Sequence, residues 1–180
     1  MPRRAWDAPL VGRAAELATL EEAMTAAGAG SPAVVLIAGE AGIGKSRLAA
    51  EAATRALANG WQVLSGGCLD LAEASVPYLP LVDALRELSM VTGGDGLPPL
   101  LRRWLQGEAQ ESSTPLPGEL AQAQVYAAYL EVLRNTSSTG SPLALVVEDL
   151  HWADRGTRDL LSYLIRGLTP ATARLVSLLC

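Results

Sequence analysis

The feature that most constrains this chain is a glycine-rich segment, Gly39-Glu40-Ala41-Gly42-Ile43-Gly44-Lys45-Ser46, which matches the pattern GxxxxGKS. It follows the apolar run 33–38, which predicts a fully buried parallel strand. From Lys45 to Asn59, apolar residues recur at helical spacing. A loop between a strand and a helix can point its backbone N–H groups at phosphate oxygens, so we predict a phosphate-binding loop here.

The residue types in this loop suit a nucleotide with a bound metal ion. Lys45 can reach the β- and γ-phosphates as a compact cation, and it is the only lysine among the fourteen basic residues. The hydroxyl of Ser46 is expected to ligate Mg²⁺. The residues predicted to contact the nucleotide in this loop are Gly39, Glu40, Ala41, Gly42, Ile43, Gly44, Lys45, Ser46 and Arg47. A chance match and a dinucleotide-binding loop are both disfavoured, the latter because the glycines are spaced GxxGxG rather than GxGxxG.

A second apolar run, 143–147, ends in the acids Glu148 and Asp149. The carboxyl ends of parallel strands share one edge of a sheet, so we expect this pair near the phosphate loop. We assign Glu148 to the metal and Asp149 to activation of the attacking water, although these two roles can be exchanged. Alone, two acids after a strand are more often a helix cap, but the phosphate loop in the same chain favours a catalytic set of Lys45, Glu148 and Asp149.

Periodicity elsewhere predicts an α/β fold of three layers around a parallel sheet. Further helices are expected at 14–27, 81–88, 119–134 and 155–168, and further strands at 61–65 and 173–180. Three other segments are expected to be irregular: a turn at 66–67, a mobile surface insert at 91–118 and a polar loop at 136–141. The helix at 119–134 is expected to bury an apolar stripe of Leu120, Ala123, Ala127, Leu130 and Leu133.

Composition excludes several classes of protein. The net charge of −5, with arginines scattered along the chain, argues against direct binding of nucleic acid. No apolar stretch approaches the roughly 20 residues of a membrane-spanning helix, and residues 1–7 lack the apolar run of a signal peptide, which predicts a cytoplasmic protein. Cys68 and Cys180 are too few for a disulfide framework and lack zinc-site spacing.

Four segments together resemble a known family. They are Leu10–Leu17 with its Val-Gly-Arg, the phosphate loop, Gly67-Cys68 followed by Pro77–Pro80, and Glu148–Asp154 with its Asp-Leu-His-Trp-Ala-Asp. In these the chain resembles the AAA-like ATPase domains of the STAND group, especially the N-terminal domains of large ATP-binding LuxR-type regulators. The resemblance implies a P-loop NTPase fold, ATP and Mg²⁺ as ligands, and a strand order of 5-1-4-3-2.

The resemblance also implies roles for residues outside the loop. It places Val11, Gly12 and Arg13 beside the adenine and ribose, whereas the residues alone indicate only a helix start at Gly12. His151 would either face the γ-phosphate or be a packed structural residue, and Asp154 could simply cap the helix that follows. Arg158, Arg166 and Arg174 are available, but nothing in the sequence identifies any of them as an arginine finger.

The chain stops where family members continue into a fifth strand, a lid, repeats and a helix-turn-helix. We therefore expect residues 1–180 to form one AAA-like domain, incomplete at its C-terminus. Without strand 5, the strand before the phosphate loop would be an exposed edge, which invites self-association or association with related domains. Hydrolysis by this chain alone is expected to be weak or absent.

Three functions compete on these observations. The first is an ATP-binding, slowly hydrolysing module from a STAND-type signalling ATPase. The second is a small-molecule kinase that uses the same loop for phosphoryl transfer. The third is a degenerate remnant that binds no nucleotide and acts through protein association. The intact Lys45, Ser46, Glu148 and Asp149 favour the first.

Overall fold

A computed structural model describes residues 11–69, 77–93, 96–106, 118–139, 141–169 and 175–180. Its sheet has four parallel strands in the order β1-β4-β3-β2. The strands are β1 (Ala33–Leu36), β2 (Gln62–Gly67), β3 (Leu143–Glu148) and β4 (Leu175–Leu179). This order agrees with the expected 1-4-3-2, while the part of the layout that involves a fifth strand stays a prediction.

Helices alternate with these strands along the chain. They are α1 (Ala14–Gly28), α2 (Lys45–Ala58), α3 (Leu79–Thr92), α4 (Pro99–Leu105), α5 (Gly118–Thr139) and α6 (Arg155–Gly167), with a 3₁₀ turn η2 (Leu150–Trp152) after β3. Their ends carry ordinary stop and start signals: the Asp154 side chain caps α6, and Gly93 ends α3 in the left-handed conformation. In the part of the chain that the structure describes, no helix is both long and apolar enough to cross a bilayer.

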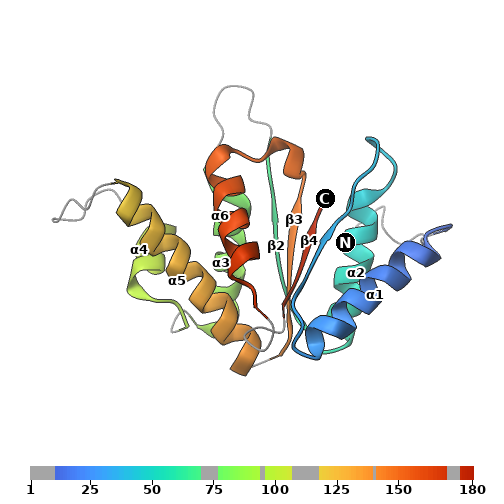
Figure 1. Cartoon of the computed structure of the whole chain (residues 1–180), viewed down its shortest axis with the longest axis horizontal. Helices are drawn as coiled ribbons and strands as arrows, with labels where there is room; N and C mark the ends of the chain where they lie inside the picture. The colour runs from blue at the N-terminus through green and yellow to red at the C-terminus, as the bar shows by residue number, and fades with distance from the viewer. Residues whose placement is uncertain (1–10, 70–76, 94–95, 107–117, 140, 170–174) are drawn as a thin grey trace, which may run out of the picture.

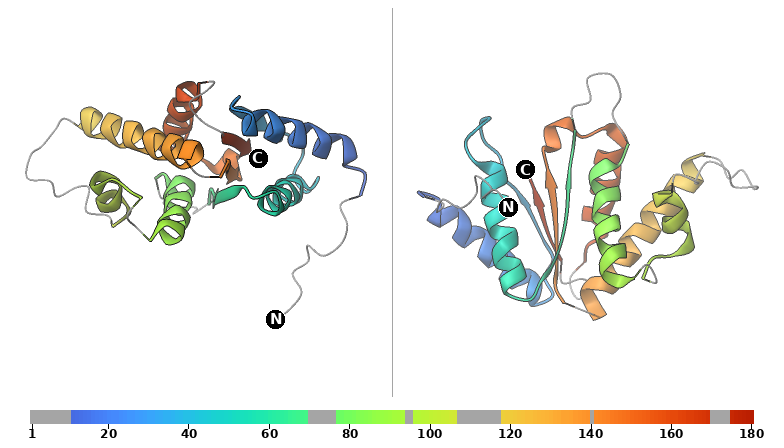
Figure 2. Two further views of the ribbon diagram at one scale, coloured as in Figure 1. Left: turned by 90° about the horizontal axis from the view of Figure 1, so that it is seen from below. Right: turned by 180° about the vertical axis from the view of Figure 1, so that it is seen from behind.

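The helices cover the sheet from both sides, as Figures 1 and 2 show. α1 and α2 pack on one face, and α3, α5 and α6 lie on the other, with α4 outside them against α3 and α5. Alternate side chains of β3 enter the two cores: Leu145 and Val147 pack under α3, α5 and α6, whereas Ala144 and Val146 pack under α1 and α2. The chain is therefore an α/β fold whose central strand is buried on both faces.

Strand β1 departs from the prediction of a fully buried strand. Val35 packs against the α1–α2 core, but Val34 is 41% exposed and Leu36 64% exposed on the opposite face. The reason is position: β1 lies at the end of the sheet, pairs only with β4 among the described residues, and has no helix over its second face. Among the described residues β1 is therefore an edge strand of the sheet, while the absence of a fifth strand beside it stays a prediction.

The predicted turn at Gly66-Gly67 is wrong, because both glycines belong to β2. Gly67 pairs with Glu148 of β3 and so extends the ladder to the carboxyl edge. At Gly66 the absence of a side chain is a packing requirement: a Cβ there would lie 2.0 Å from the carbonyl oxygen of Pro80 at the start of α3. The glycine pair therefore marks a close approach of backbone rather than the end of the strand.

The region 91–118 was predicted to be a surface insert, and this is wrong where the structure describes it. α3 continues to Thr92, and α4 forms at 99–105, where the sequence indicated one or two helical turns. Leu97 and Leu101 are buried within the core beneath α3 and α5. The remainder of the predicted insert, residues 94–95 and 107–117, lies outside the described residues.

Helix α5 is longer than predicted, and the face that it buries is not the predicted one. Its last turn includes residues 136–139, so the predicted polar loop at 136–141 is wrong for those four residues. Of the predicted stripe, Leu130 and Leu133 are buried, but Leu120, Ala123 and Ala127 are exposed. The face that enters the core is defined instead by two tyrosines, Tyr126 and Tyr129, whose rings bury far more area than an alanine.

Candidate functional site

The glycine-rich segment forms a loop between β1 and α2, as predicted. Gly42 has φ 77° and Gly44 has φ 97°, backbone conformations that side chains other than glycine rarely adopt. Helix α2 begins at Lys45, directly after Gly44. Its first N–H groups have no acceptor within the helix, so they and the positive end of the helix dipole are available to an anion bound at the loop. This arrangement suits an anion with several oxygens.

The Lys45 side chain curls back over this loop. Its Nζ donates to the carbonyl oxygens of Gly39 and Glu40, each at 3.0 Å. Among the described residues, no carboxylate forms an ion pair with Lys45. The ammonium therefore rests on neutral acceptors at the mouth of the loop, and a phosphate oxygen there would offer it a stronger, charged partner.

Arg13 connects the segment before α1 to the same loop. Its Nη2 donates to the carbonyl oxygen of Ile43 at 3.0 Å, and its Nη1 forms an ion pair with Glu16 at 2.6 Å. The hydrogen bond from Arg13 lowers the pKa of Glu16. Gly12 turns the chain with φ 74°, and Val11 is 83% exposed. Of the three residues predicted at the base end, the structure brings Arg13 into contact with the loop.

A cavity of about 250 Å³ lies between α1, β1 and the loop. Leu20, Val35 and Leu48 give it apolar walls. Its polar rim includes Arg13, Glu16, Thr19 and Lys45. Sequence reasoning missed Glu16 and Thr19, because helical periodicity assigns them to a solvated face of α1 and gives no sign that β1 ends beside them.

The two acids lie at the carboxyl end of β3, at the sheet edge that also carries the loop. Glu148 is half-buried and Asp149 is exposed. Asp149 has φ 54° and ψ 41°, the left-handed conformation, which is uncommon for a residue other than glycine and often marks a functional position. Glu148 is fixed through its backbone, because its carbonyl oxygen accepts from the Cys68 N–H at 3.0 Å.

Cys180, just after β4, links the loop to the acids. Burial, together with the Glu148 and Asp149 carboxylates, raises the pKa of its thiol to about 11, and a hydrogen bond from the Asp149 backbone and the Lys45 ammonium oppose this rise. The Cys180 N–H donates to the carbonyl oxygen of Val147 at 3.0 Å, and β4 pairs with β1 on its other side. The end of β4 therefore lies between the loop after β1 and the acids at the end of β3, while the catalytic set of Lys45, Glu148 and Asp149 stays a prediction. Burial likewise raises the pKa of Cys68 to about 11, so both cysteines are protonated thiols at neutral pH.

The oxygen donors here fit Mg²⁺ by their chemistry. Ser46 is the second residue of α2, and Glu148 is the last residue of β3. Both side chains offer hard oxygen atoms as ligands. Within the described ranges, no group of three or more His, Cys, Asp or Glu side chains could hold a metal ion. Mg²⁺ typically takes one or two protein ligands and completes its shell with substrate phosphates and water.

The remaining candidates are placed less centrally. His151 is exposed, with its ring 4.9 Å from that of Trp152, so the expectation of a packed structural histidine is wrong. Asp154 caps α6, because its side chain accepts from the Thr157 N–H at 3.0 Å, which confirms the capping interpretation. Arg158 donates to the carbonyl oxygen of Ala153, and Arg174 lies outside the described residues.

The family is decided by comparison with known proteins. The sequence model of the AAA ATPase domain matches residues 9–178. The chain belongs to the AAA ATPase domain family. The domain is also similar to an uncharacterized protein of Rhizobium meliloti (strain 1021), with 31% identity over 176 residues. That alignment covers 85% of this chain and 17% of the relative, so the AAA ATPase domain corresponds to a small part of that protein's length.

Proposed function

We propose that this AAA ATPase domain binds ATP together with Mg²⁺ and hydrolyses it slowly. The observation that carries the proposal is the order of the sheet: β4 lies between β1 and β3, so Lys45, which follows the loop after β1, and the acids at the end of β3 lie at the same carboxyl edge. A cation that neutralises phosphate charge and acids that hold a metal ion and a water are the parts a phosphoryl-transfer site requires. Membership of the AAA ATPase domain family supports the more general conclusion that the domain is a nucleotide-binding ATPase module.

Each residue then has a role derived from its place. The backbone N–H groups at 42–46 would hold the β-phosphate, and the Lys45 ammonium would exchange its loop carbonyls for the β- and γ-phosphates. Ser46 and Glu148 are the residues that would hold Mg²⁺, which when bound supplies positive charge to the phosphates. The exposed Asp149 would orient or deprotonate the attacking water.

The base end of the nucleotide is assigned to the 11–13 segment and the adjoining cavity. The cavity runs from Lys45 along β1 to α1, and its apolar walls suit a flat aromatic base. Arg13 supports this assignment because it contacts Ile43 in the loop and borders the cavity. Val11 and Gly12 remain part of the proposal as the segment that leads into Arg13.

We further propose that the domain is one module of a larger cytoplasmic signalling ATPase of the STAND type, in which nucleotide state controls a regulator. The length of the Rhizobium meliloti relative, of which the domain matches 17%, is consistent with such an arrangement. The four motif segments that resemble LuxR-type regulators support it from the sequence. Partners would then be ATP or ADP and related ATPase domains.

Calorimetric titration of the purified domain with ATP in Mg²⁺ tests the proposal. Lys45→Ala should weaken ATP affinity by about a hundredfold, or about 2.7 kcal/mol, because the bound phosphates lose a charged partner. Arg102→Ala, which removes an exposed cation on α4, serves as the matched control and should leave the affinity unchanged. If the wild-type domain is folded but takes up no ATP, the proposed function is wrong.

A phosphate-release assay on the same samples separates hydrolysis from transfer to another molecule. The proposed function predicts slow release of inorganic phosphate that is lost in Lys45→Ala. Release that appears only when a small-molecule acceptor is added, together with a phosphorylated acceptor, would instead identify a kinase.

A further inference from the structure

The connection between β3 and α6 is short and carries one of the two acids. It runs from Asp149 through η2 to Asp154, and its entry is held by a 2.7 Å hydrogen bond from the Leu150 N–H to the carbonyl oxygen of Cys180. Within the turn, the backbone N–H of Trp152 donates to the carbonyl oxygen of Asp149 at 2.8 Å. Left-handed backbone costs an aspartate less than most residues but is still uncommon, so contacts at both ends of the turn help to hold Asp149 in this conformation.

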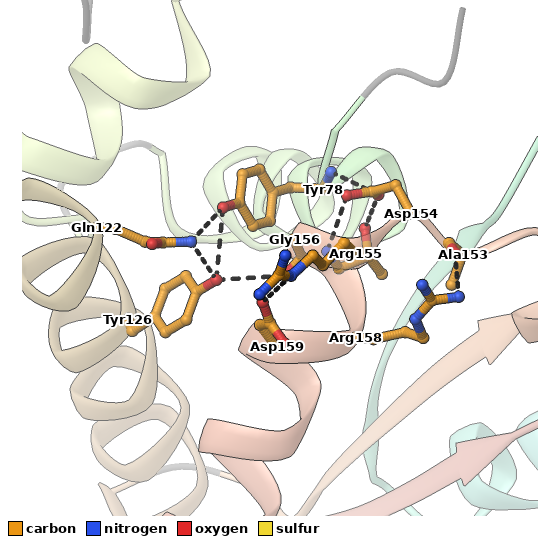
Figure 3. A network of polar contacts seen from close by, with 10 residues as sticks. Tyr78, Gln122, Tyr126, Ala153, Asp154, Arg155, Gly156, Arg158 and Asp159 are labelled. Carbon is orange, nitrogen blue, oxygen red and sulfur yellow. Dashed lines mark hydrogen bonds and ion pairs between the residues drawn. The ribbon is translucent and has the colours of Figure 1, made fainter. Parts of the chain in front are cut away.

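The exit of the turn is fixed by the Asp154 carboxylate, which joins two helices (Figure 3). One oxygen accepts from the Thr157 N–H at 3.0 Å at the start of α6, and the other accepts from the Tyr78 N–H at 3.2 Å at the start of α3 and from the Thr157 hydroxyl. Burial would raise the pKa of Asp154, but hydrogen bonds from Thr157, Tyr78 and Gly156 outweigh it and lower the pKa. The carboxylate is thus ionised and shared between α3 and α6.

The α3 partner of Asp154 has little freedom to move. Pro80 lies so close to β2 that a Cβ on Gly66 would be 2.0 Å from its carbonyl oxygen. On the α6 side, a Cβ on Gly156 would lie 2.7 Å from the Tyr78 ring. Tyr78 lies between these contacts and has φ 62°. In the described ranges, Tyr78 and Asp149 are the two residues other than glycine that have a positive φ. Both unusual conformations therefore flank the Asp154 connection.

The other end of Tyr78 is anchored as well. Gln122 of α5 donates to the Tyr78 hydroxyl at 2.9 Å and to the Tyr126 hydroxyl at 2.8 Å. Tyr126 in turn donates to the carbonyl oxygen of Gly156 at 3.3 Å, which returns the network to α6, as Figure 3 shows. The Trp104 ring packs edge-on against Tyr78 with centroids 5.5 Å apart. Tyr78 is thus held by α4, α5 and α6 together.

We propose that Asp154 is a positioning residue for Asp149, which ties the exit of the β3–α6 turn to the closely packed start of α3 and so keeps Asp149 in its left-handed conformation. This inference rests on the proposed function for its consequence in ATP hydrolysis. Its structural part, the hold on residues 149–153, concerns the nucleotide-free domain.

Asp154→Asn is the discriminating variant. The side-chain oxygen of an asparagine can still accept from the Thr157 N–H and cap α6. Its NH₂ group replaces the oxygen that accepts from the Tyr78 N–H, and because NH₂ cannot accept, the Tyr78 N–H loses its partner. Asp159→Asn removes the same charge from an exposed position of the same helix, where Asp159 pairs with Arg155 at 3.6 Å, and is the matched control.

Amide hydrogen exchange of the nucleotide-free domain gives the first readout. Asp154→Asn should raise exchange at Leu150 and Trp152 at least tenfold, whereas a purely capping role would raise exchange only in the first turn of α6. The second readout is the rate of phosphate release with ATP and Mg²⁺, which should fall at least fivefold in Asp154→Asn and stay within twofold in Asp159→Asn.

Exchange at Leu150 and Trp152 that matches the Asp159→Asn control would overturn the inference. If wild-type domain in the same samples takes up no ATP, the proposed function fails, and the exchange comparison still decides the positioning role. Should Asp154→Asn not fold, Asp154→Ser replaces it, because a serine can still cap α6 at the Thr157 N–H but is too short to accept from the Tyr78 N–H as well: at least threefold faster exchange at Trp152 supports the inference, and no change contradicts it.

Discussion

At the scale of single residues, the site separates into groups whose roles differ with their exposure. Lys45 and Glu148 are half-buried at the ends of α2 and β3, where backbone geometry fixes them, while Asp149 is exposed in a turn. A metal ligand needs a fixed position, whereas a group that activates water needs access to solvent. This contrast favours Glu148 over Asp149 as the acid that holds Mg²⁺.

The two acids can be separated by isosteric substitution. Glu148→Gln should weaken Mg²⁺-dependent ATP binding about tenfold, or about 1.4 kcal/mol, because it removes a charged metal ligand. Asp149→Asn should leave binding within about twofold and lower phosphate release instead, since asparagine tolerates the left-handed backbone at this position. Calorimetry and phosphate-release rates on both variants check this, and a reversed pattern would exchange the two roles.

Arg13 is the second residue whose effect can be isolated. Arg13→Met removes the hydrogen bond to the Ile43 carbonyl oxygen and the ion pair with Glu16, so ATP affinity should fall about threefold to tenfold as the loop loses its support. Arg55→Met breaks the ion pairs of Arg55 with Glu21 and Glu51, away from the loop, and should leave affinity unchanged. Equal losses in the two variants would show that Arg13 acts only through general stability.

At the scale of elements, the edge strand β1 is the part of the sheet most open to a partner. Val34 and Leu36 are exposed on the face that lacks a helix, and β1 pairs only with β4 in the described part of the chain. If the domain self-associates through this edge, Val34→Lys should abolish the association, because charge at an edge strand opposes strand pairing. Sedimentation velocity over a concentration series measures this, with Leu57→Lys, at an exposed position of α2, as control.

A wild-type domain that stays monomeric throughout the series would remove the case for association through β1. If Leu57→Lys dissociates the domain as effectively as Val34→Lys, the contact surface lies on α2 instead.

The packing of α3 against α6 makes a second prediction at this scale. Gly156→Ala places a Cβ 2.7 Å from the Tyr78 ring and should lower the free energy of unfolding by about 1–3 kcal/mol through overpacking. Gly67→Ala meets no atom within 4 Å and should change it by less than about 0.5 kcal/mol. Urea unfolding of both variants tests this, and equal stabilities would mean that Tyr78 can move aside.

The elements also show where sequence reasoning succeeds and fails. The loop, α2, β3 and α6 follow from strong local signals: the GxxxxGKS pattern, an unbroken apolar run and a capping aspartate. The face of α5 could not be predicted, because alanines look apolar in sequence while Tyr126 and Tyr129 decide the packing. Gly66 was misjudged because its partner, Pro80, is brought close only by the tertiary fold.

At the scale of the whole molecule, the site is assembled from segments far apart in the chain. The parallel sheet brings the loop after β1, the end of β4 and the acids after β3 to one edge, in an order that hydrophobic patterns alone do not specify. The sequence therefore predicts which residues reach this edge, and their role in phosphate chemistry stays a prediction. It could not predict Glu16 and Thr19 at the cavity or the Tyr78–Asp154 connection, because these depend on how layers pack.

The central claim is that the phosphates of ATP bind within the 39–46 loop, next to the end of β3. Backbone amide NMR of the domain, titrated with ATP and Mg²⁺, tests it most directly. The account predicts that the largest shifts fall on amides 42–47, where the N–H groups would donate to phosphate, with smaller shifts at Glu148 and Asp149. Binding that leaves amides 42–47 unshifted and perturbs another part of the domain would contradict the account.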